Sequence, residues 1–158
     1  MPSFLSCALF KFLDILVNSA KYAKICRFIK LVEKFMNQNT FCWIDIPVIN
    51  LDRAINFYAA ILEQEVQKHS QGGFEFGLLP HTEDNVSGCL AVMDDRKPSR
   101  NGPLVYLQVE GRLDQAIEIV EKEGGEILSG KEQMGPYGYR AIILDTEGNS
   151  IALYSKNA

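Results

Sequence analysis

Apolar and polar side chains alternate along residues 41–48, which predicts a strand with one face against a core. Asn50 follows at a helix N-cap position, and apolar residues at helical spacing then continue to about Leu62. Shorter strand patterns follow at residues 65–69, 74–79 and 86–93. The first part of the chain therefore predicts the element order βαβββ.

The alternation also assigns a side to each residue of the first strand and the helix. The strand side expected to face the core carries Cys42, Ile44, Ile46 and Val48, and the other side carries Phe41, Trp43, Asp45 and Pro47. The apolar side of the helix carries Leu51, Ala54, Ile55, Tyr58 and Leu62. We expect the two apolar sides to pack on each other.

The pentapeptide Leu-Asp-Arg-Ala-Ile at residues 51–55 returns as Leu-Asp-Gln-Ala-Ile at residues 113–117. Each copy follows an apolar run that ends in valine, and each opens a helical segment. The second copy predicts a strand at 103–109 and a helix at 113–123, which Gly124-Gly125 ends. Three strands are then predicted at 126–128, 139–144 and 150–154. A turn at 145–149 joins the last two strands as a hairpin. The same βαβββ unit is therefore present twice.

A chain of 158 residues has the size of one ordinary domain. Two units of about 60 residues each are too small for separate cores and must share one. We predict an α+β fold for residues 40–156, with module one at 41–94 and module two at 102–156. The polar residues 94–103, rich in helix and strand breakers, form the linker.

Residues 1–36 differ from the rest of the chain, because apolar residues at helical spacing alternate with six lysines and arginines and predict a basic amphipathic helical extension. Lys11 and Asp14 interrupt the apolar runs, so a transmembrane span is not predicted, and the start lacks the basic residues of a secretory signal. Three explanations stay open. The segment packs on its own or a neighbouring domain, precedes a true start at Met36, or binds a membrane surface or partner.

A net charge of −4 and a pI of about 5.2 argue against nucleic acid as a partner. The four cysteines are widely spaced without a Cys-x-x-Cys pair, so neither a zinc site nor a disulfide framework is indicated, and a cytoplasmic location fits best. Cys42 and Cys89 lie in apolar strand patterns, where we expect them to act as small buried hydrophobes.

Three motifs occur in order along residues 40–156: Val-Ile-Asn-Leu-Asp-Arg-Ala-Ile-Asn-Phe-Tyr at 48–58, the helix end Glu123-Gly124-Gly125, and Leu-Asp-Thr-Glu-Gly-Asn-Ser-Ile-Ala-Leu at 144–153. Together they resemble the glyoxalase, bleomycin-resistance and dioxygenase superfamily, also called vicinal oxygen chelate proteins. The resemblance implies mixed sheets from both modules that curl around a cleft. It also implies a homodimer that completes or flanks this cleft.

In metal-dependent members of that superfamily, a histidine or similar donor near the start of each module's first strand binds a divalent ion together with carboxylates on each last strand. In this sequence the positions fall on Trp43, Leu104, Ala152 and residues 90–91. None of these side chains is a metal donor. We therefore expect no metal and no other cofactor. His69 and His81, at a strand end and in a polar loop, are not assigned to metal.

Strand alternation places an aromatic face with a few polar groups on the side of the sheets away from the helices, which is typical of a small-molecule site. The predicted ligand contacts on this face are Trp43, Tyr106, Gln108 and Tyr154. Tyr137, Tyr139 and Arg140 are also predicted contacts, because the resemblance places the loop that leads into their strand near the mouth of the cleft. In the alternative interpretation, Trp43 and Tyr106 only fill the space of a lost metal and its substrate. In a separate alternative, Tyr137, Tyr139 and Arg140 only pack as ordinary loop residues.

Asp45 is the candidate catalytic residue, because a carboxylate that faces an apolar cleft is costly unless it is paired or functional. It could act as a general base. The other possibility is a structural pairing with Arg140 or with a tyrosine hydroxyl.

Three functional hypotheses follow. The leading one is a metal-independent member of the superfamily that binds a small organic molecule, with no membrane partner expected. The second is a metal-dependent lyase or dioxygenase, like lactoylglutathione lyase, with Asp45, Gln108 and His81 as atypical ligands. The third is an interaction module that uses the N-terminal helix. Whether the protein is an enzyme stays open.

Overall fold

A computed structural model describes residues 25, 27–29, 40–82 and 85–157, and the chain divides into two units, Met1–Thr40 and Phe41–Ala158. In the first unit, Ile25 and residues 27–29 are helical and exposed, and the rest of the extension predicted at residues 1–36 lies outside the described residues. Among the described residues, no helix is long and apolar enough to cross a membrane.

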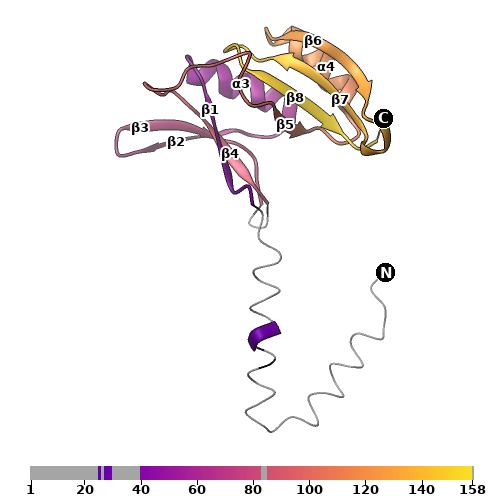
Figure 1. Ribbon diagram of the computed structural model, residues 1–158. Helices are drawn as coiled ribbons and strands as arrows, with labels where there is room; N and C mark the ends of the chain where they lie inside the picture. The colour runs from indigo at the N-terminus through magenta and orange to yellow at the C-terminus, as the bar shows by residue number, and fades with distance from the viewer. Residues whose placement is uncertain (1–24, 26, 30–39, 83–84, 158) are drawn as a thin grey trace. The chain divides into compact units, whose positions relative to one another are not determined.

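In the described residues of module one, one helix and four strands follow in the predicted order. These are β1 (Trp43–Pro47), α3 (Leu51–Leu62), β2 (Gln67–Gln71), β3 (Phe74–Leu78) and β4 (Ser87–Ala91). The sheet order is β1-β4-β3-β2, in which β1 runs parallel to β4 and the other pairs are antiparallel (Figure 1).

Module two repeats this arrangement. Its elements are β5 (Val105–Gln108), α4 (Leu113–Lys122), β6 (Glu126–Gln133), the 3₁₀ turn η1 (Gly135–Tyr137), β7 (Tyr139–Leu144) and β8 (Ser150–Ser155). The sheet order β5-β8-β7-β6 matches module one, with β5 parallel to β8 and a β7–β8 hairpin. The predicted α+β fold of tandem βαβββ modules is confirmed, as two mixed four-stranded sheets rather than a closed barrel.

The sixth strand is longer than the prediction of residues 126–128. β6 continues to Gln133 because it stays paired with β7 through two register shifts, between Ile127 and Ser129 and between Ser129 and Glu132. Register shifts of this kind add residues to one strand and break the alternation of apolar and polar positions. The exposed second half of β6 therefore shows no strand pattern in the sequence.

Helix α3 begins as predicted, since the Asn50 side chain accepts a hydrogen bond from Arg53 N at 3.0 Å. Its buried face is shifted from the prediction: Phe57 and Ile61 are fully buried, whereas Ile55 and Leu62 are only half-buried. The reason is that α3 packs against α4 as well as against its own sheet. Ile46 on β1 and Val48 just after it enter the core as predicted, but Cys42 precedes the strand and is exposed.

One hydrophobic core serves both modules, as the length of the chain requires. Buried residues from both copies form a single cluster, including Ile46, Phe57 and Leu90 from module one and Val120, Ile143 and Leu153 from module two. The shared core places the free edges of β1 and β5 between the modules.

The turn between β7 and β8 also joins the modules, through hydrogen bonds to the start of α3. Glu147 Oε2 accepts from Ile49 N and Asn50 N, both at 2.9 Å, and its carboxylate binds the Arg53 guanidinium at 2.7 and 3.1 Å. Nearby, the buried Tyr58 hydroxyl donates to Asp145 Oδ2 at 2.7 Å. A carboxylate at a helix N-terminus stabilises the exposed N–H groups and opposes the helix dipole.

Candidate functional site

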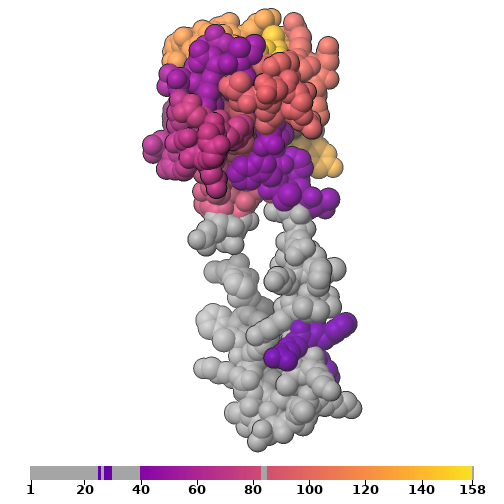
Figure 2. Space-filling model, turned by 90° about the vertical axis from the view of Figure 1, so that its left-hand side faces the viewer, coloured from indigo at the N-terminus to yellow at the C-terminus, as the bar shows by residue number. Residues whose placement is uncertain are grey.

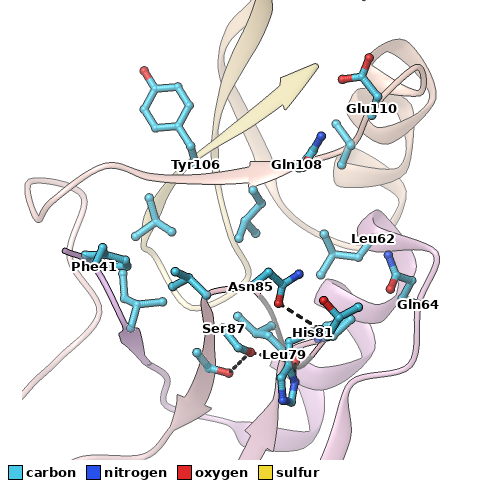
Figure 3. A pocket seen from close by; sticks show the side chains of 18 of the residues that line it. Phe41, Leu62, Gln64, Leu79, His81, Asn85, Ser87, Tyr106, Gln108 and Glu110 are labelled. Atoms are coloured by element: carbon cyan, nitrogen blue, oxygen red, sulfur yellow. Dashed lines mark hydrogen bonds between the residues drawn. The ribbon is translucent and has the colours of Figure 1, made fainter. Parts of the chain in front are cut away.

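A hollow of about 780 Å³ lies between the modules, at the end of α3. Apolar side chains line part of it, namely Ile44, Leu62, Leu79, Val86, Val105 and Leu107, and polar side chains including Gln64, His81, Asn85, Ser87 and Arg112 line the rest. Figure 3 shows β5 on one side of this space and the β3–β4 connection on the other. The volume is in the range of small-molecule sites.

Several of the polar side chains that line the hollow already form contacts within the β3–β4 connection. Ser87 Oγ donates to Leu79 O at 3.1 Å, and Asn85 Oδ1 accepts from Thr82 N at 3.0 Å. His81 Nδ1 lies 3.3 Å from Leu79 O. These contacts hold the connection in place. Gln64, Gln108 and Arg112 are among the other polar side chains that line the hollow.

A second, smaller hollow of about 370 Å³ is lined by Ile44 and Val105, as the larger hollow is, and also by residues of the linker between the modules. Asp45, Arg96 and Lys97 line it. Figure 2 shows the segment near residue 100 lying against module one on this side of the domain. The linker is held there by Ser99 N, which donates to Asn149 Oδ1 at 3.1 Å.

The predicted ligand contacts do not surround one cavity. Of the seven, only Tyr106 and Gln108 line the larger hollow, and the Tyr106 ring points away from it (Figure 3). The alternation itself is as predicted: Tyr106 pairs with Ala152 and Gln108 with Tyr154, on the face of the second sheet away from α4. Trp43, 43% exposed, lies on the corresponding face of the first sheet. Ligand binding by these seven residues stays a prediction.

Within the second sheet, the predicted residues form two small polar groups. Arg140 donates to Glu132 at 2.5 Å and to the Tyr106 hydroxyl at 2.6 Å. The Tyr154 hydroxyl donates to the backbone oxygen of Tyr137 at 2.7 Å. Tyr139 lies beneath Lys131, whose ammonium group is 5.4 Å from the ring centre.

Asp45 does not form the predicted pairing with Arg140 or a tyrosine hydroxyl, because its partners come from its own sheet. Its Oδ1 accepts from Trp43 Nε1 at 2.8 Å and from Cys89 Sγ at 3.3 Å. Parallel pairing of β1 with β4 puts Asp45 opposite Cys89, which explains the contact. A role as general base stays a prediction.

Cys89 is expected to resist alkylation in the folded protein. Burial, and then the hydrogen bond to Asp45, raise the pKa of its thiol to about 12, so only about one molecule in ten thousand carries a thiolate near pH 8. With iodoacetamide, peptide mass spectrometry should find exposed Cys42 modified and Cys89 intact until a denaturant is added. Equal modification of both in the native protein would contradict this.

The positions that the family resemblance implies for a metal do not fit a divalent ion. Trp43 presents an indole, Leu90, Ala91 and Ala152 are completely buried apolar residues, and Leu104 precedes β5. His69 stacks on Phe76 instead, with ring centres 5.4 Å apart. In residues 40–82 and 85–157, no three His, Cys, Asp or Glu side chains are grouped as a metal site.

Sequence reasoning missed most of the larger hollow, because its walls are apolar positions that the alternation assigns to the core. One signal was present. The second pentapeptide is preceded by Arg112 where the first is preceded by Asn50. Arginine cannot accept a hydrogen bond, so it cannot cap a helix N-terminus as asparagine does. In the structure Arg112 makes no capping hydrogen bond at α4.

A family model described as Glyoxalase/Bleomycin resistance protein/Dioxygenase superfamily matches residues 40–153. No curated protein matches the chain.

Solved structures share the fold at low sequence identity. A glyoxalase/bleomycin resistance protein from Albidiferax ferrireducens is 15% identical with a TM-score of 0.60, covering 74% of this chain and 98% of its own. A superfamily member from Sphaerobacter thermophilus is 18% identical with a TM-score of 0.55, covering 75% and 98%. A variant of glyoxalase I from Zea mays is 19% identical with a TM-score of 0.58, covering 73% and 45%. With the family model matching most of its length, the chain belongs to the glyoxalase, bleomycin resistance protein and dioxygenase superfamily.

Proposed function

We propose that this protein binds a small organic molecule, without a metal ion, in the hollow between its two modules. The observation that carries the proposal is a space of about 780 Å³ lined by apolar and polar side chains from both modules. A ligand in this space would bury its surface against Ile44 on one side and Leu107 on the other, and gain affinity by leaving water.

The metal-dependent alternative needs Asp45, Gln108 and His81 to converge on one ion. Gln108 and His81 both line the larger hollow, but Asp45 lies in the smaller one. Its Oδ1 already accepts two hydrogen bonds. This separation favours the metal-independent function.

Native mass spectrometry of protein purified from its own source, combined with metal analysis, tests the proposal. We expect an organic molecule that stays bound after dialysis against a chelator, and less than one divalent ion per chain.

The same spectrum gives the mass of the assembly. We expect a homodimer, since Trp43 and Phe74 leave aromatic surface exposed on the open face of the first sheet. One tightly held divalent ion per chain, whose removal releases the organic molecule, would overturn the metal-independent function.

A further inference from the structure

Arg112 occupies an unusual place for an arginine at the start of a helix. It precedes α4, but its side chain reaches across to the other module, where Nη2 donates to Ile61 O at 3.2 Å. A positive charge at the carboxyl end of α3 is favourable, because the helix dipole is negative there. The side chain is 23% exposed and lines the larger hollow.

One nitrogen of this guanidinium is not satisfied. Arg112 Nη1 is 3.1 Å from Glu63 Oε1, which is close enough for an ion pair. It is nevertheless buried and has no hydrogen-bond partner within the described part of the chain. A buried donor without a partner costs free energy, more so when it is charged. The cost would be removed by a ligand that supplies an oxygen acceptor.

Two carboxylates near Arg112, those of Glu110 and Glu63, could accept a hydrogen bond from Nη1. Glu110 accepts from Lys156 N at 2.7 Å and from Asn157 Nδ2 at 2.6 Å, and the hydrogen bond from Lys156 N is the main cause of its lowered pKa. Figure 3 shows the Glu110 carboxylate pointing away from the hollow. Glu63 is 55% exposed, and it is the carboxylate within ion-pair distance of Arg112. A bound anion would therefore compete with Glu63.

We infer, building on the proposed function, that the ligand of the larger hollow is an organic anion whose acidic group binds Arg112. Its apolar body lies between the side chains of Ile44 and Leu107, and its carboxylate, sulfonate or phosphate replaces Glu63 as the partner of Nη1. Such charge-assisted hydrogen bonds are stronger than neutral ones, and a guanidinium can form two in parallel.

The experiment uses two fluorescent probes with the same aromatic body, anilinonaphthalene sulfonate and its neutral analogue phenylnaphthylamine, with the full-length protein. Arg112→Met should weaken sulfonate binding about tenfold or more, because it removes the charge-assisted hydrogen bonds. Glu63→Gln should strengthen sulfonate binding about threefold, because it removes the competing charge. Both variants should bind the neutral probe within about twofold of the unchanged protein.

Matched control variants distinguish the effect of a direct contact with the sulfonate from the effect of a change in the net charge of the protein. Arg100→Met and Glu65→Gln change the net charge by the same amounts at exposed sites, and neither should alter sulfonate binding. Leu107→Trp fills the hollow and should reduce the binding of both probes, which places them in it.

Arg112→Met also removes the contact with Ile61 O, so its folding is checked by circular dichroism. If it does not fold, Glu63→Gln still decides the question, because this substitution keeps Arg112, the donor to Ile61 O. Unchanged sulfonate affinity in Glu63→Gln, or equal losses of both probes in folded Arg112→Met, would overturn the inference and leave the proposed function standing. Failure of the unchanged protein to bind either probe would instead count against the hollow as a ligand site.

Discussion

Replacing Glu147 by alanine should lower the free energy of unfolding by about 3 kcal/mol, because several donors lose one buried acceptor together. The Glu147 side chain is completely buried. Without it, Ile49 N and Asn50 N lose their acceptor at the start of α3, and the Arg53 guanidinium loses its ion pair. Arg53 is half exposed, so water can replace part of that interaction, and most of the loss comes from the backbone N–H groups.

Urea unfolding at neutral pH measures this change. The control is Lys68→Ala, which removes an ion pair with Asp52 at 2.8 Å between side chains that are 40% and 75% exposed. Exposed pairs of this kind contribute little, so the control should lose less than about 1 kcal/mol. A loss for Glu147→Ala as small as that of Lys68→Ala would show that the carboxylate does not hold the modules together.

The Glu147 carboxylate also makes the free energy of unfolding depend on pH in the acidic range. Burial alone would raise the pKa of Glu147, but hydrogen bonds from Arg53, Asn50 and Ile49 outweigh it and hold the pKa below the ordinary 4.5. The folded state therefore binds the proton less readily than the unfolded state. The contribution of the carboxylate is complete above pH 4.5 and is lost as the pH falls through the folded-state pKa. The stability difference between the unchanged protein and Glu147→Gln should shrink over that acidic range.

Replacing Gly88 by alanine should cost about 3 kcal/mol for a steric reason. Gly88 lies opposite Ile44 in the parallel pairing of β4 with β1. A methyl group at Gly88 would overlap the Ile44 carbonyl oxygen and the branched part of its side chain. The two strands must separate to admit it, because the backbone oxygen cannot rotate away. Since Ile44 and Gly88 both line the larger hollow, probe binding should fall as well.

Gly130→Ala is the matched control. Gly130 is also in a strand, but an added methyl group there would meet nothing within 4 Å. Its stability should change by no more than about 0.5 kcal/mol. Thermal and urea unfolding of both variants measure the difference. Equal stability of the two would mean that β1 and β4 can adjust around a larger residue at position 88.

Local patterns in the sequence were sufficient for the order of the elements and for the fold, although not for the full length of β6. Alternation identified the strand at Trp43–Pro47, Asn50 identified the start of α3, and the turn at residues 145–149 identified the β7–β8 hairpin. The repeated pentapeptide then established the duplication. These features depend on residues a few positions apart, whose backbone geometry and turn chemistry are set by the chain itself.

The partners of the candidate site residues were decided only by the tertiary structure. The pairing of β1 with β4 joins Asp45 to Cys89, and the packing of the modules brings Glu147 to Asn50, 97 positions away. The same packing leaves the hollow and sets Arg112 at the end of α3. The sequence by itself determined the order of the elements and which side of β1 enters the core, whereas the buried side of α3 was set by its packing on α4. Where two apolar surfaces meet without filling the space between them depends on side chains from both modules, and only the folded domain brings these together.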